Sequence, residues 1–115
     1  MKNPQRLTGL LESFQENQPL VEGLVDLFLK HTPGLLSEFL RLMRENRVNE
    51  FHGVAFRLKS NLRVLGLHEI QNQVEILGTS FRNGVTPIEL KPDLDTLEVS
   101  LLDACHQLRL LHSKT

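Results

Sequence analysis

The residues of this chain best suited to chemistry are a histidine and two basic residues that lie on either side of a phenylalanine. Phe56 follows His52 by four residues, Lys59 follows Phe56 by three, and Arg63 follows Lys59 by four. On an α-helix this spacing places the four side chains along one stripe. An imidazole can act as a nucleophile, and basic side chains can neutralise a phosphoryl group. Phe56 is the unusual member, because the stripe is expected at the surface and its ring is apolar.

The remaining histidines, glycines, carboxylates and the cysteine do not show the spacing of a metal, nucleotide or catalytic site. Four further histidines lack the i, i+4 pairing, with each other or with a carboxylate, of a metal site on a helix; they are His31, His68, His106 and His112. The glycines form no phosphate-binding loop pattern. The single cysteine, Cys105, is expected to fill space in the core, and Glu69 and Glu75 to lie on a solvated helix face. We therefore expect no metal, no nucleotide and no other cofactor.

The elements that position these residues are predicted to be helices, because apolar residues recur at spacings of three and four. The pattern predicts a short helix over about residues 4–17 and a second over 20–43 with a kink or break at Pro33. A third is predicted over 48–65 and a fourth from about 67 to Asn83-Gly84. The last helix is predicted over 90–111, after a loop that carries Pro87 and Pro92. We predict an all-α fold, an antiparallel four-helix bundle with an additional short N-terminal helix.

Each predicted helix has a face on which apolar residues recur. The second helix has one apolar stripe, Leu20, Leu24, Leu27 and Phe28. The third has a heptad-like seam, Val48, Phe51, Ala55, Leu58, Leu62 and Leu65. The last repeats at four and three residues through Leu90, Leu94, Leu97, Leu101, Ala104, Leu108 and Leu111. The seam of the third helix predicts that Leu58 faces the core while Phe56 does not.

Size and composition fit a single domain over residues 1–115. The chain is 40% hydrophobic and 23% charged with a formal net charge of -1, so a packed core is expected. A single cysteine, no secretory leader and no run of 18 apolar residues indicate a cytoplasmic protein without a membrane partner. No nucleic-acid partner is expected either, because four basic residues on one helix would contact few phosphates; they are Arg47, Arg57, Lys59 and Arg63. The oligomeric state stays open.

One run in the third predicted helix carries a resemblance to a known family. The run is Ala55-Phe56-Arg57-Leu58-Lys59-Ser60, and Gly66 follows six residues after Ser60. It resembles the signature of histidine-containing phosphotransfer (HPt) domains, Ala-His-x-Leu-Lys-Gly/Ser followed by Gly, at every position except the histidine. The flanking segments LVDLFLKHTPGLLSEFLRLM and GLHEIQNQVEILGTSFRNG are similar to the helices that precede and follow the signature in that family. The resemblance covers about residues 20–85.

The resemblance implies a four-helix bundle that exchanges phosphoryl groups with receiver domains in two-component phosphorelays. In that family the histidine attacks an aspartyl phosphate of the receiver, the lysine neutralises phosphoryl charge, and the small residue leaves room for the receiver surface. Lys59 and Ser60 hold those places here, whereas Phe56 holds the place of the nucleophile. A benzyl ring has no lone pair, so no phosphate can be accepted at position 56.

These observations predict a non-catalytic, HPt-like interaction module and no enzyme. It would bind a response-regulator receiver domain or a receiver-bearing hybrid sensor kinase and modulate a phosphorelay. Its receiver-binding residues would be His52, Phe56, Arg57, Lys59, Ser60 and Arg63. The alternatives are an active phosphocarrier that uses His52, which lies one turn from the motif position, and an engineered His-to-Phe variant of such a carrier. Whether the ring of Phe56 anchors a partner or extends the core is left open by the sequence.

Overall fold

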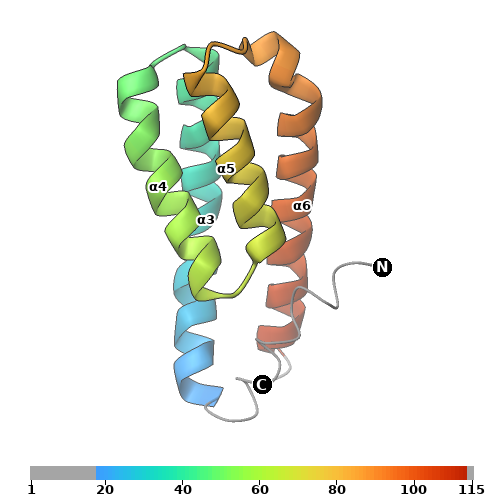
Figure 1. The fold of residues 1–115 in the computed structure, drawn as a ribbon. Helices are drawn as coiled ribbons and strands as arrows, with labels where there is room; N and C mark the ends of the chain where they lie inside the picture. The colour runs from blue at the N-terminus through green and yellow to red at the C-terminus, as the bar shows by residue number, and fades with distance from the viewer. Residues whose placement is uncertain (1–17, 114–115) are drawn as a thin grey trace.

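The computed structural model describes residues 18–113, and all regular structure in that range is helical. The helices are α3 (Gln18–Arg44), α4 (Val48–Val64), α5 (His68–Arg82) and α6 (Pro87–Ser113), and they run alternately up and down (Figure 1). Both α3 and α5 contact α4 and α6, which closes a helical bundle. The prediction of an all-α bundle is confirmed for these residues, whereas the short N-terminal helix was predicted over residues that lie outside the described range.

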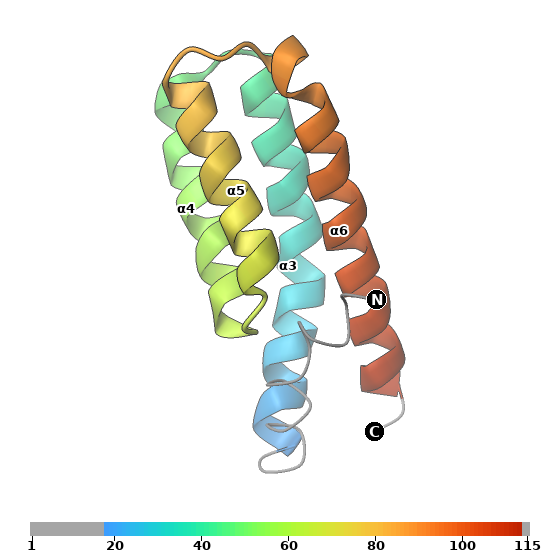
Figure 2. The ribbon, with the colours of Figure 1, turned by 45° about the vertical axis from the view of Figure 1, so that its right-hand side comes forward.

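The four helices differ in length, and this sets the shape of the bundle. The longer helices α3 and α6 have 27 residues each, whereas α4 has 17 and α5 has 15. Viewed with the right-hand side turned forward, α4 and α5 form a short hairpin that packs along the upper part of the longer pair (Figure 2). The motif helix α4 is therefore held between α3 on one side and α5 on the other.

Each connection between the described helices contains one residue in the left-handed region. These residues are Asn46 (φ 58°), Gly66 (φ 73°) and Gly84 (φ 96°), and asparagine and glycine adopt this conformation at low cost. After α4, the amide of Gly66 donates to the carbonyl of Arg63 at 2.9 Å and the amide of Leu67 to that of Leu62 at 3.0 Å. The glycine of the motif thus ends α4 and reverses the chain into α5.

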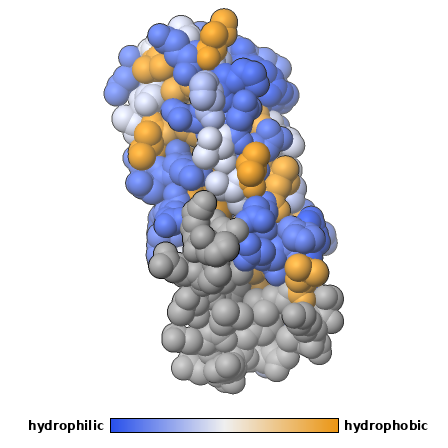
Figure 3. All heavy atoms as spheres, turned by 90° about the vertical axis from the view of Figure 1, so that its right-hand side faces the viewer, coloured by the Kyte–Doolittle hydropathy of each residue, from blue (hydrophilic) through white to orange (hydrophobic). Residues whose placement is uncertain are grey.

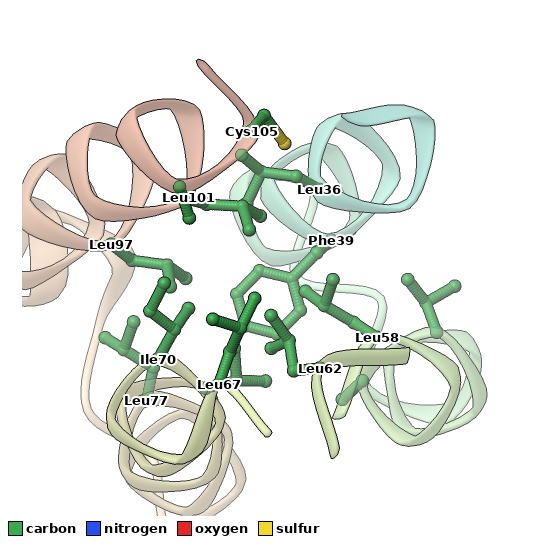
Figure 4. Packing of buried hydrophobic residues seen from close by; sticks show 14 of the residues in the cluster. Leu36, Phe39, Leu58, Leu62, Leu67, Ile70, Leu77, Leu97, Leu101 and Cys105 are labelled. Atoms are coloured by element: carbon green, nitrogen blue, oxygen red, sulfur yellow. The ribbon is translucent and has the colours of Figure 1, made fainter. Parts of the chain in front are cut away.

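The core is built mainly from leucines and contains three phenylalanines whose rings contact each other at tilted and edge-to-face angles. The ring centroid of Phe51 on α4 lies 4.7 Å from that of Phe39 on α3 and 4.8 Å from that of Phe81 on α5. Figure 4 shows labelled side chains of all four helices, Phe39 of α3 among them, pointing into the space between the helices. The predicted seam of α4 is buried apart from Val48, and that of α6 is buried from Leu90 to Leu108; the side chain of Leu111 lies outside the described part. Cys105 is buried, as predicted.

At Pro33 the sequence predicts a kink or a break in the second helix. The break does not occur, because α3 is one helix with Pro33 inside it. Burial of Phe28, Leu36 and Phe39 on the same helix stabilises it, although Pro33 has no N–H to donate to a helical carbonyl.

The last helix also begins earlier than predicted, at Pro87, and contains Pro92. Its start is a capping box that the sequence analysis missed. The hydroxyl of Thr86 accepts from the amide of Glu89 at 3.2 Å, and the carboxylate of Glu89 accepts from the amide of Thr86 at 3.1 Å. Pro87 then takes the first helical position, where no N–H is needed.

Candidate functional site

The motif residues on α4 are divided between the core and the surface. Ala55 and Leu58 are buried, while the side chain of Phe56 is 59% exposed. This follows from helix geometry, since Phe56 lies 100° from Ala55 and 200° from Leu58 around the helix axis. The ring of Phe56 therefore lies at the surface and does not extend the core, while its role as a partner anchor stays a prediction.

On one side of Phe56, an apolar groove runs between α3 and α4. Its volume is about 880 Å³, and it is lined by Leu24, Leu27, Phe28, His31, Gly34, Leu35, Glu38, Phe56, Arg57, Ser60, Asn61, Val64 and Leu65. Leu27 and Val64 are each more than half exposed at its edge. The amide nitrogen of Asn61 donates to the hydroxyl of Thr32 at 3.5 Å across the two helices.

The apolar stripe predicted for α3 is partly wrong. Leu20 and Leu27 were assigned to the apolar stripe of this helix together with Phe28, yet both are more than half exposed. The buried face instead runs through Val21, Val25 and Phe28. A second apolar face of α3 is left uncovered because α4 packs against only part of the helix. This second face forms one wall of the groove.

On the other side of Phe56, a smaller polar hollow lies between α4 and α5. Its volume is about 390 Å³, and it is lined by Phe56, Lys59, Arg63, His68, Gln71, Asn72 and Glu75. The ammonium group of Lys59 donates to the carboxylate of Glu75, forming an ion pair that links the two helices. The hydrogen bond from Lys59, and then its charge, hold the pKa of the Glu75 carboxyl below its usual range. Lys59 is 23% exposed in this arrangement.

The predicted receiver-binding residues therefore do not form one continuous patch. Phe56 borders both hollows and forms the ridge between them. Arg57 and Ser60 line the apolar groove, whereas Lys59 and Arg63 line the polar hollow. His52 is exposed on α4 and borders neither.

The charges around the ridge are unevenly compensated. Arg57 and Arg63 form no ion pair with any residue of 18–113, while Glu38, at the other edge of the apolar groove, is paired with Arg41 at 2.9 Å. Within residues 18–113, positive charge without an ion pair therefore lies on both sides of Phe56. A surface with a central aromatic ring and a basic rim is suited to binding an acidic protein surface.

Sequence reasoning missed the walls that α3 and α5 contribute. Glu75 was predicted to lie on a solvated face, and it is about half exposed but paired with Lys59. A signal for this pair was present: α4 and α5 form an antiparallel hairpin that turns at Gly66, with Lys59 seven residues before the turn and Glu75 nine residues after it. Residues at similar distances from such a turn lie opposite each other.

Among residues 18–113, no group of three or more histidine, cysteine, aspartate or glutamate side chains is placed to hold a metal ion. Over the same residues, every helix is too short or too polar to cross a membrane. Comparisons of the chain with protein-family models, curated proteins and solved structures found no match.

Proposed function

We propose that this chain is an HPt-like interaction module that binds the receiver domain of a response regulator or of a hybrid sensor kinase without accepting phosphate at position 56. Through this binding it modulates two-component phosphorelay signalling. The observation that carries the proposal is the exposed ring of Phe56, which is 59% exposed and stands on a ridge where the HPt signature has its nucleophile.

Two properties of the surface support a receiver as the partner. The phosphoacceptor site of a receiver is acidic, and the surface around Phe56 carries Arg57 and Arg63 without ion pairs in residues 18–113. The apolar groove beside the ring offers area that a partner can bury, and its exposed edges are Leu27 and Val64. Apolar residues on the side of the molecule that carries α6 are instead scattered among hydrophilic ones (Figure 3).

The geometry favours binding over phosphotransfer. His52 lies one helical turn from Phe56, so its ring is displaced by about 5–6 Å from the motif position. In-line transfer requires the reacting atoms to approach within about 3–3.5 Å. His52 also borders neither hollow, and Lys59 is already paired with Glu75.

The proposal is tested by phosphotransfer from a panel of phosphorylated receiver domains of the source organism, with binding measured in parallel. The parent protein should bind at least one receiver and take up no acid-labile phosphate, whereas Phe56→His should become labelled by that receiver. Labelling of the parent would assign a phosphocarrier, through His52 or another histidine. Absence of binding to every receiver would contradict the proposed function.

Substitution of Phe56 tests whether the receiver binds at this ridge. Phe56→Ala should weaken receiver binding by about 1–3 kcal/mol if the ring is an interface anchor. The matched control is Leu102→Ala, because Leu102 is a 49% exposed apolar residue on α6, a helix that lines neither hollow. Equal losses of receiver affinity in the two variants would mean that the receiver does not bind at Phe56.

A further inference from the structure

The polar hollow between α4 and α5 is lined mainly by side chains that can donate hydrogen bonds. Apart from Phe56 and Glu75, every residue of 18–113 that lines it carries an N–H donor; these residues are Lys59, Arg63, His68, Gln71 and Asn72. Its volume of about 390 Å³ is that of several water molecules, each of which takes about 30 Å³ in the liquid. The hollow therefore has both the donors and the room for a phosphoryl group.

The charge of this region is positive. Lys59 and Arg63 each contribute one positive charge and Glu75 one negative charge. Arg82, in the last turn of α5, adds a third positive charge close to Glu75. The hydrogen bond and charge of Lys59 lower the pKa of the Glu75 carboxyl, and the charge of Arg82 lowers it further. With His68 counted as neutral, the net charge of the region is about +2.

Arg63 is the residue of the hollow best placed to bind an incoming anion. The ammonium group of Lys59 is already paired with Glu75, whereas Arg63 is exposed and forms no ion pair with any residue of 18–113. A guanidinium also presents its donors in a planar fork that matches two oxygens of a phosphoryl group.

The two states of a receiver differ in the anion that they present to this surface. An unmodified aspartate carries one negative charge, whereas a phosphoryl group carries about two at neutral pH and has three acceptor oxygens. Phe56 itself lines the hollow, so a group that faces the signature position also meets the donors beside it. Because Coulomb attraction is proportional to charge, the positive hollow attracts the dianion more strongly than the carboxylate.

We propose that the polar hollow binds the phosphoryl group of a phosphorylated receiver, with Arg63 as the residue that determines this specificity. The inference rests on the proposed function, since it takes a receiver as the partner. The phosphoryl group stays on the receiver's aspartate, because the ring at position 56 has no lone pair to attack it. The module accordingly recognises phosphorylated receivers in preference to resting ones and does not discharge them.

The test compares the affinity of the full chain for a receiver with and without beryllofluoride, which adds to the receiver's aspartate as a phosphoryl analogue. The Mg²⁺ concentration is held constant and the ionic strength is about 0.15 M, where the Debye length is about 8 Å. The parent protein should bind the beryllofluoride form more tightly. Arg63→Gln should reduce this preference by roughly two- to fivefold, the effect of one exposed charge.

Arg57→Gln is the matched control for Arg63→Gln. Arg57 is also an exposed arginine of α4 without an ion pair in residues 18–113, but it lines the apolar groove on the other side of Phe56. Six residues separate the two arginines, which is about 9 Å along the helix axis and exceeds the Debye length. Arg57→Gln should therefore leave the ratio of the two affinities unchanged, even where it weakens both.

A substitution of opposite sign tests the same hollow. Glu75→Gln removes its negative charge and should shift the ratio further toward the beryllofluoride form, by roughly two- to fivefold. Asp95→Asn makes the same change of charge on α6, where Asp95 pairs with Lys91 outside both hollows, and should leave the ratio unchanged.

The outcomes distinguish this inference from the proposed function. If the parent binds neither form of any receiver, the proposed function is wrong. If the parent prefers the untreated form, or if Arg63→Gln leaves the ratio unchanged, the role of the hollow is wrong while the receiver remains the partner. Equal effects of Arg63→Gln and Arg57→Gln would assign the preference to overall charge and also overturn the inference.

Inorganic phosphate added to the module alone distinguishes a site for free phosphate from one for a phosphorylated receiver. Phosphate that shifts the side-chain NMR signals of His68 and Asn72, together with an affinity ratio that does not respond to Arg63→Gln, would assign the hollow to free phosphate and overturn the inference.

Discussion

Two phenylalanines on α4 allow the division between core and surface to be tested with the same substitution. Phe51 and Phe56 lie five residues apart on one helix, and their side chains are 0% and 59% exposed. The ring of Phe51 contacts those of Phe39 and Phe81. Phe51→Ala should therefore lower the free energy of unfolding by about 3–5 kcal/mol, since it removes buried area and leaves a cavity among three helices.

The expected loss at Phe56 is smaller and follows from its exposure. A fully covered phenylalanine buries roughly 200 Å². With 59% of the side chain exposed, about 80 Å² is covered, which corresponds to an upper limit of about 2 kcal/mol at roughly 25 cal/mol per Å². Alanine also has the higher helix propensity, by about 0.5 kcal/mol, so the net loss for Phe56→Ala should be about 1–1.5 kcal/mol.

Urea denaturation followed by far-UV circular dichroism measures both losses. Phe51→Ala should be less stable than Phe56→Ala by at least about 1.5 kcal/mol. If Phe51→Ala does not fold while Phe56→Ala does, the same contrast between a core and a surface position is observed. Equal losses, or a greater loss at Phe56, would refute the assignment of Phe56 to the surface and with it the argument for an interface anchor.

Three further substitutions test other parts of the fold. Leu62→Ala, at a fully buried position of the α4 seam, should cost about 2–5 kcal/mol in a urea titration, and a negligible cost would mean that the seam is misassigned. Thr86→Ala should cost about 1 kcal/mol through loss of the capping box, and thermal unfolding of the parent and variant checks this. The pKa of the Glu75 carboxyl is lowered in the fold, so the stabilisation from its ion pair is present above the ordinary pKa of 4.5 and is lost as the pH falls through the folded value. The parent should therefore be more stable than Glu75→Gln by about 0.2–1 kcal/mol at pH 7, and this difference should vanish in strong acid. A difference that grows in acid would contradict the ion pair.

Much of the helical architecture could be predicted because it depends on local periodicity. The ends of α4 and α5 lie within a residue or two of the predicted ones, since Gly66 and Asn83-Gly84 mark where the apolar pattern stops. The exposure of Phe56 also follows from its angle to the buried seam.

The errors arose where tertiary packing decided the outcome. Pro33 and Pro92 lie inside helices because the burial of neighbouring leucines and phenylalanines outweighs a missing backbone hydrogen bond. Leu27 lines a groove because α4 covers only one side of α3. The pairing of Lys59 with Glu75 depends on the register between two helices, which periodicity within a single helix does not determine.

The single cysteine gives the protein a reporter of its own opening motions. Cys105 is 1% exposed, and burial raises the pKa of its thiol, so a labelling reagent that reacts with thiolate meets almost no target in the closed bundle. Labelling must then proceed through transient opening of α6, and about every 1.4 kcal/mol of opening free energy slows it tenfold. Labelling rates with and without a receiver, the proposed partner, would therefore measure in the unmodified protein whether binding raises the free energy of opening at α6.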